Sequence, residues 1–312
     1  MEETMIQTPE TQDSATPEYV IETRALTKRF PNKIAVDHVN MHVRRGDIYG
    51  LIGKNGAGKT TAMKLILGIM RPSAGEIKLF GSKSLFKMRS RVGSLIETPG
   101  FYKGCSAYEN MKRFALVSGG TDQEIHDLLA FVGLGEVSKK KAGHFSLGMK
   151  QRLGIAIALL GNPELLILDE PINGLDPTGM KEIRDLIIKL NREKGVTFMI
   201  SSHLLDELGK IATRYGIINN GELVDEISSA ELTERCRRGI EIITDDPDKA
   251  AQILSENGYT DYQRNEWSLL LHADVDRSAE INKLLVTSGV SVMGLSVRQN
   301  GFEDYFIERL GK

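Results

Sequence analysis

The sequence contains very little cysteine. Only Cys105 and Cys236 occur in its 312 residues, and neither they nor the six histidines fall at metal-ligand spacing. The sequence therefore predicts no disulfide framework and no zinc site. This cysteine usage is typical of a cytosolic protein with reduced thiols.

Long apolar runs and a large net charge are absent as well. The longest apolar stretches, such as residues 165–168, are strand-sized, whereas a membrane-spanning helix needs about 20 apolar residues. Lys and Arg total 40 and Asp and Glu total 42, a net charge of −2, so no basic domain indicates a nucleic-acid partner. Residues 1–18 lack the apolar centre of a signal peptide and are predicted to be a disordered tail.

The most informative feature of the sequence is one glycine-rich motif. Residues 53–60 read GKNGAGKT and separate a predicted buried strand, residues 47–52, from a predicted helix that includes residues 62–67. Glycines let backbone N–H groups surround phosphate oxygens, the lysine spans the β- and γ-phosphates, and the threonine hydroxyl binds Mg²⁺. The start of the helix favours the same anion. We predict an ATP site formed by Gly53, Asn55, Gly56, Ala57, Gly58, Lys59, Thr60 and Thr61.

The order of the remaining patterns predicts an α/β fold of the P-loop type. Residues 19–26 and 33–43 read as antiparallel strands, and apolar runs then alternate with helical patterns as in a mainly parallel sheet. Residues 105–160 predict an inserted helical subdomain, and the NNG sequence at 219–221 predicts a hairpin. We expect this domain to span residues 19–227.

Residues 228–312 are predicted to form a small accessory α+β domain. Strands at 240–242, 267–271 and 290–292 alternate with two short amphipathic helices in a β-α-β-β-α-β-like pattern. Phe302, Tyr305 and Phe306 then recur at helical spacing, which predicts a helix that docks on its own domain or on the core. The segment carries no catalytic motif, so we expect a regulatory or dimer-stabilising role.

Two acids and a histidine indicate hydrolysis. Asp169 ends the apolar run at 165–168 and is placed to hold Mg²⁺, while Glu170 can polarise an attacking water. His203 follows the next predicted strand, residues 196–201, which should lie beside the acidic strand. Its imidazole can then donate to a γ-phosphate and stabilise developing charge.

The sequence FSLGMKQR at residues 145–152 completes a set that resembles the ATP-binding subunits of ABC transporters. The resemblance covers about residues 19–226 and includes the loop, the acidic pair and the histidine in family order. It implies that Ser146 and Gly148 contact ATP held by a second subunit. The expected assembly is a head-to-tail homodimer, with a heterodimer as the alternative, that sandwiches two ATP molecules.

The resemblance implies further roles and shows two departures. Asp176 belongs to the matching set, and Phe30 corresponds to the aromatic that stacks on adenine, although a strand-end core residue is the alternative interpretation of Phe30. The signature has Leu147 and Met149 where the family commonly has glycine and glutamine. Glu97 replaces a common glutamine and is expected to ligate Mg²⁺ with Thr60 and Asp169.

The signature and the loop glutamate together resemble the bacitracin-export and lantibiotic-immunity branch. This implies a separate permease, export of a peptide antibiotic or other amphipathic compound, and a cytoplasmic position on the inner face of the membrane.

An ABC ATPase acting on DNA or ribosomes is the first alternative function. It is disfavoured because the interval from Lys59 to Ser146 has no room for a coiled coil or zinc module, and because the chain has one cassette. A nucleotide-binding regulator that does not hydrolyse ATP is the second alternative function. The presence of both Glu170 and His203 disfavours it. The lysines at 139–141 are either a solvated helix end or a phosphate or lipid contact.

Overall fold

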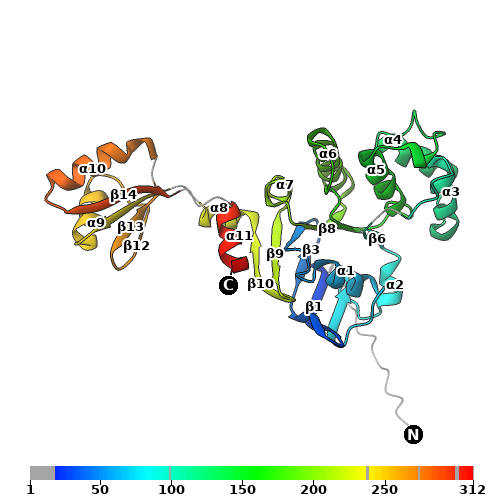
Figure 1. Cartoon of the computed structure of the whole chain (residues 1–312), viewed down its shortest axis with the longest axis horizontal. Helices are drawn as coiled ribbons and strands as arrows, with labels where there is room; N and C mark the ends of the chain where they lie inside the picture. The colour runs from blue at the N-terminus through cyan, green and yellow to red at the C-terminus, as the bar shows by residue number, and fades with distance from the viewer. Residues whose placement is uncertain (1–17, 98–99, 237–238, 273–274, 299–301, 312) are drawn as a thin grey trace, which may run out of the picture.

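The computed structural model describes residues 18–97, 100–236, 239–272, 275–298 and 302–311 (Figure 1). Residues 1–17 of the predicted tail lie outside the described residues. The main sheet has six strands in the order β10-β9-β4-β8-β7-β6. Their bounds are Glu222–Ser228, Arg214–Asn219, Ile48–Ile52, Thr197–Ser202, Leu165–Asp169 and Val92–Leu95. β10 pairs antiparallel with β9, and the other pairs are parallel, as the sequence predicts.

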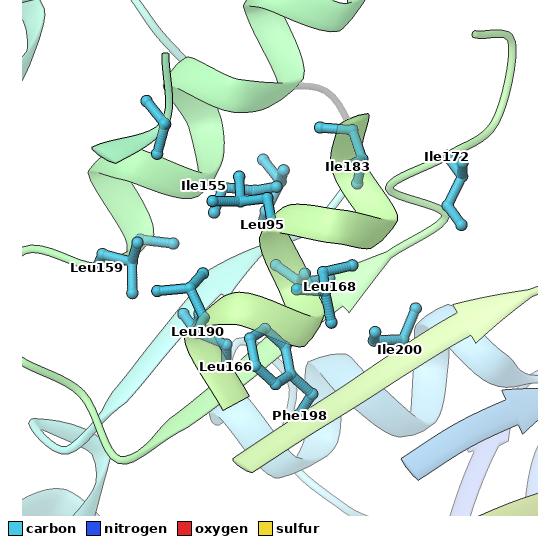
Figure 2. Close-up of a cluster of buried hydrophobic side chains, with 14 of the residues drawn as sticks. Leu95, Ile155, Leu159, Leu166, Leu168, Ile172, Ile183, Leu190, Phe198 and Ile200 are labelled. Carbon is cyan, nitrogen blue, oxygen red and sulfur yellow. The ribbon is translucent and has the colours of Figure 1, made fainter. Parts of the chain in front are cut away.

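Both faces of the main sheet are buried. β4, β7 and β8 have no exposed residue, because successive side chains of a strand point to opposite faces and each face is covered. Leu166 and Leu168 of β7 belong to one hydrophobic cluster with Phe198, and Leu165 and Ile167 belong to another. Figure 2 shows part of the first cluster, in which Ile183 and Leu190 of the long helix α6, Pro177–Lys194, lie among side chains of the sheet such as Leu168.

A second sheet covers the other cluster. It pairs β1, Tyr19–Phe30, antiparallel with β2, Lys33–Val39, β3, His42–Arg44, and β5, Ala74–Leu79. The predicted strand at 33–43 is divided into β2 and β3, and between them the Asn40 side chain accepts a hydrogen bond from the Ala25 N–H at 2.8 Å. The helices α1, Lys59–Leu67, and α2, Leu85–Arg89, lie beside this sheet (Figure 1).

The predicted helical subdomain is present between β6 and β7. It contains α3, Ala107–Ser118, α4, Asp122–Phe131, the 3₁₀ turn η1, Ala142–His144, and α5, Leu147–Ala158. These helices stand apart from α1 and α2 in Figure 1, next to α6. The short helix α7, Leu205–Gly209, follows β8.

The predicted β-α-β-β-α-β pattern of the C-terminal lobe is confirmed. Its antiparallel sheet has the order β12-β13-β11-β14, and its elements are β11, Gly239–Thr244, α9, Pro247–Glu256, β12, Tyr262–Arg264, β13, Ser268–Leu271, the 3₁₀ turn η2, Val275–Arg277, α10, Ser278–Thr287, and β14, Val292–Arg298. The lobe has its own hydrophobic cluster. Gly239 pairs with Arg298, so the chain enters and leaves the lobe at one end of its sheet.

Two helices beyond residue 227 pack against the main core. They are α8, Ser229–Arg235, and α11, Phe302–Gly311. Leu232 and Phe306 are buried in the cluster that contains Tyr215, and the Phe306 and Tyr215 rings are 5.8 Å apart. The Tyr305 hydroxyl donates to Asp225 Oδ2 of β10 at 2.6 Å. The sequence predicts that the aromatic helix docks either on its own domain or on the core, and α11 docks on the core. The domain boundary at 227–228 stays a prediction.

Candidate active site

The phosphate loop connects β4 to α1 and needs its glycines for steric reasons. At Gly58, φ is 113°, and a Cβ would come within 2.4 Å of the Ala35 carbonyl oxygen. At Gly53, a Cβ would come within 2.4 Å of the Ile218 carbonyl oxygen. Side chains at these positions would push the loop off the neighbouring strands. The glycines therefore keep the loop close to these strands, and the backbone N–H groups at the N-terminus of α1 are left free to bind an anion.

Lys59 lies between the loop and Glu170, one of the two predicted catalytic residues. Its side chain is 6% exposed, and its Nζ donates to the Gly53 carbonyl oxygen at 2.7 Å. The same Nζ is 3.4 Å from Glu170 Oε1. A buried ammonium at this position is placed to meet both a bound phosphate and the Glu170 carboxylate.

Asp169 is brought to the loop because the carboxyl ends of parallel strands share one edge of the sheet. The Thr60 hydroxyl donates to Asp169 Oδ2 at 2.9 Å. Hydroxyl and carboxylate oxygens are the donors that Mg²⁺ prefers, and Mg²⁺ usually completes its shell with water and substrate phosphate. In the described part of the chain no three His, Cys, Asp or Glu residues form a metal cluster.

Glu170 and His203 are in direct contact. His203 Nδ1 is 2.7 Å from Glu170 Oε2, and the His203 side chain is one-third exposed. Glu170 has a φ of 50°, so its backbone leaves the extended conformation of β7. The turn directs its carboxylate toward Lys59 and His203, and the predicted pair of catalytic residues is thus close together.

The cavity beside these residues has the size of a small-molecule site. It has a volume of about 410 Å³ and is lined by Phe30, Lys33, Ala35, Asn55, Gly56, Gly58, Lys59, Thr60, Thr61, Glu170 and Asn173. Phe30 is 42% exposed at this cavity, so the alternative of a core aromatic does not fit its position. Lys28 Nζ lies 5.4 Å from the centre of its ring.

The structure does not bring every predicted site residue to this cavity. Ser146 caps α5, where its Oγ accepts from the Met149 N–H at 3.3 Å, and Asp176 caps α6 by accepting from the Gly179 N–H at 3.2 Å. Neither these residues nor Gly148 line the cavity of their own chain.

Glu97, another predicted metal ligand, does not line this cavity either. It has a φ of 61°, its side chain is 63% exposed, and its Oε1 accepts from Lys64 Nζ at 2.6 Å. Its role as a ligand stays a prediction.

Four residues of the site are not among those predicted from the sequence, namely Lys33, Ala35, Asn173 and Ser201. Lys33 lines the cavity and its Nζ donates to the Gly56 carbonyl oxygen at 3.0 Å. Ser201 is buried and bonds to both acids of the acidic pair. The sequence could indicate Ser201 by its position at the end of the predicted strand that lies beside Asp169. Nothing in the sequence indicates Lys33.

Comparison with known proteins places this site in a family. The profile of the ABC transporter family matches residues 36–173. The chain is 42% identical over 299 residues to the bacitracin transport ATP-binding protein BcrA of Bacillus licheniformis, covering 94% of this chain and 97% of that protein. The chain belongs to the ABC transporter family. It is an ATP-hydrolysing subunit of a transporter whose permease is a separate polypeptide.

Two further relatives agree with this assignment. The lantibiotic transport ATP-binding protein SrtF of Streptococcus pyogenes is 45% identical over 201 residues, covering 64% of this chain and 87% of that protein. The solved structure of cbiO1 from Clostridium perfringens, part of the ABC transporter complex cbiONQ, matches with a TM-score of 0.63 and 27% identity over 70% of this chain and 91% of that one. No helix among the described residues of this ABC subunit is long and apolar enough to cross a membrane.

Proposed function

We propose that this ABC subunit drives export of a peptide antibiotic of the bacitracin or lantibiotic kind, from the inner face of the membrane. The observation that carries the proposal is the match to BcrA, which extends through the C-terminal lobe as well as the ATPase cassette. The SLGMKQR signature at residues 146–152 and Glu97 support the same proposal, because together they resemble the bacitracin-export and lantibiotic-immunity branch.

The residues of the cavity are proposed to divide the work of hydrolysis. Lys59 and the loop N–H groups bind the β- and γ-phosphates, and Phe30 stacks on adenine. Thr60 and Asp169 would hold Mg²⁺, which neutralises phosphate charge when bound. Glu170 takes a proton from the attacking water, and His203 donates to the γ-phosphate.

Antibiotic resistance tests the proposal. The chain is co-expressed with the membrane protein that co-purifies with it, in a bacitracin-sensitive host. We expect the minimal inhibitory concentration of bacitracin or of a lantibiotic to rise and to return to the host value with Lys59→Ala. Lys87→Ala, an exposed lysine of α2, is the matched control and should keep the resistance. Co-sedimentation with ribosomes or DNA, without a permease, would instead contradict the proposal.

Ser146 is predicted to act on ATP bound by the partner subunit. Gly148 has no steric need to be glycine in its own chain, since the nearest atom to a Cβ there would be 3.8 Å away. The small residue therefore fits a close approach from outside the chain. A dimer of one Lys59→Ala chain and one Ser146→Arg chain has one intact site, so we expect it to hydrolyse ATP although neither homodimer does.

The matched control for this experiment carries both substitutions on one chain, paired with a wild-type chain. Each of its two sites is then damaged once, so hydrolysis should be lost. If Ser146→Arg alone hydrolyses ATP at the wild-type rate, Ser146 is only the cap of α5.

The C-terminal lobe is predicted to be dispensable for nucleotide binding. Because Gly239 and Arg298 are paired neighbours, residues 239–298 can be deleted and the flanks joined by a short Gly-Ser linker, which keeps α8 and α11 on the core. We expect calorimetry to give unchanged Mg-ATP affinity, with any loss appearing in dimer formation or transport. A folded deletion variant with weakened ATP binding would place part of the site in the lobe.

A further inference from the structure

Ser201 connects the two acids of the active site through one hydroxyl. It lies in β8 opposite Asp169 in the parallel register, and it is fully buried. Its Oγ donates to Asp169 Oδ1 at 2.6 Å and accepts from the Glu170 N–H at 3.0 Å. A serine hydroxyl has one proton to donate, so donation to the carboxylate leaves its lone pairs for the N–H.

Glu170 needs this acceptor because of its backbone conformation. The ladder between β7 and β8 ends at the pair Asp169 and Ser201. With a φ of 50°, Glu170 adopts the left-handed conformation that non-glycine residues rarely take. Such a conformation persists only where the surroundings hold it in place. The Ser201 hydroxyl supplies the hydrogen bond that the strand no longer provides.

The same hydroxyl fixes how Asp169 is presented. Ser201 occupies Oδ1, so Oδ2 is the oxygen that faces Thr60, at 2.9 Å. Both acids are thereby oriented by one side chain of the neighbouring strand. The carboxylate of Glu170 then reaches His203, and the carboxylate of Asp169 reaches the phosphate loop.

We propose that Ser201 is a positioning residue that sets the relative placement of the Asp169 and Glu170 carboxylates for hydrolysis. The proposal rests on the proposed roles of these two acids. Ser201 acts through them and does not line the nucleotide cavity. Its loss should therefore slow the chemical step and leave ATP affinity nearly unchanged.

The neighbouring serine provides a matched control. Ser202 is also buried, but its Oγ accepts from the Leu204 N–H at 2.9 Å and donates to the Leu204 carbonyl oxygen at 3.4 Å. It therefore stabilises the turn after β8 and bonds to neither acid in this way. Ser202→Ala removes a hydroxyl of the same kind from the same strand.

The test compares Ser201→Ala, Ser201→Cys, Ser201→Thr and Ser202→Ala in the full chain with its permease. We expect Ser201→Ala to lower kcat by roughly ten- to a hundredfold, the range for loss of an outer partner of a ligand, with KM for ATP little changed. Ser201→Thr, which keeps the hydroxyl, should restore most of kcat. Ser201→Cys nearly keeps the volume but offers only a weak donor, so it should be slow even where the alanine variant does not fold.

The controls separate this inference from the proposed function. A wild-type kcat for Ser201→Ala or Ser201→Cys, while Glu170→Gln is inactive, would overturn the role of Ser201 and leave the function standing. An equal loss in Ser202→Ala, or a loss entirely in KM, would also overturn it. If the wild-type complex hydrolyses no ATP, the proposed function is wrong, and the role of Ser201 that rests on it is wrong as well.

Discussion

Lys59→Ala is expected to remove measurable ATP binding. The Lys59 ammonium is buried at the cavity and lies between the Gly53 carbonyl and Glu170. Without it, the γ-phosphate would meet the negative charge of Glu170, and Lys33 would be the one basic side chain left among the described residues that line the cavity. Isothermal calorimetry with Mg-ATP should therefore show no saturable heat at concentrations that saturate the wild-type protein.

The control for Lys59→Ala is Lys87→Ala, which removes one positive charge from the exposed surface of α2. Circular dichroism establishes that both variants are folded. Retained high affinity in a folded Lys59→Ala protein would contradict the assignment of this loop as the phosphate site.

Glu170→Gln is expected to stop hydrolysis while ATP stays bound. Glutamine keeps the shape of the side chain but cannot accept a proton from water, a loss worth about 10²–10⁴-fold in rate. Its amide can still bond to His203, which contacts Glu170 at 2.7 Å, so the site geometry should be preserved. Trapped ATP should then hold two subunits together, and size-exclusion chromatography should show a dimer with Mg-ATP and a monomer with ADP.

Glu193→Gln, at the exposed end of α6, is the matched control for charge and should behave as wild type. A Glu170→Gln protein that remains a monomer with ATP and hydrolyses it at the wild-type rate would remove Glu170 from the catalytic role.

The parts of the site that follow directly from a strand were predictable from the sequence. The loop at residues 53–60 and Asp169 each follow a buried strand, and parallel strands end at one edge. The contact between Thr60 and Asp169 therefore follows from topology once the strands are recognised. The neighbouring positions of Glu170 and His203 follow from the pairing of β7 with β8 in the same way.

Contacts made by side chains across the fold could not be predicted in this way. The sequence shows an apolar face on residues 302–310, but not that this face covers Tyr215 of β9. Likewise, the sequence predicts Glu97 as a metal ligand and does not indicate the hydrogen bond that its carboxylate accepts from Lys64 Nζ. β12 was not located because it has three residues, two of them exposed and charged or polar.

The central claim is that this chain hydrolyses ATP at a site completed by a second subunit. The measurement that tests it most directly is the rate of phosphate release per chain across a dilution series, with light scattering to report mass. We predict that the rate per chain falls on dilution as the ATP-bound dimer dissociates. A rate per chain that stays constant while scattering reports only monomer would contradict the account.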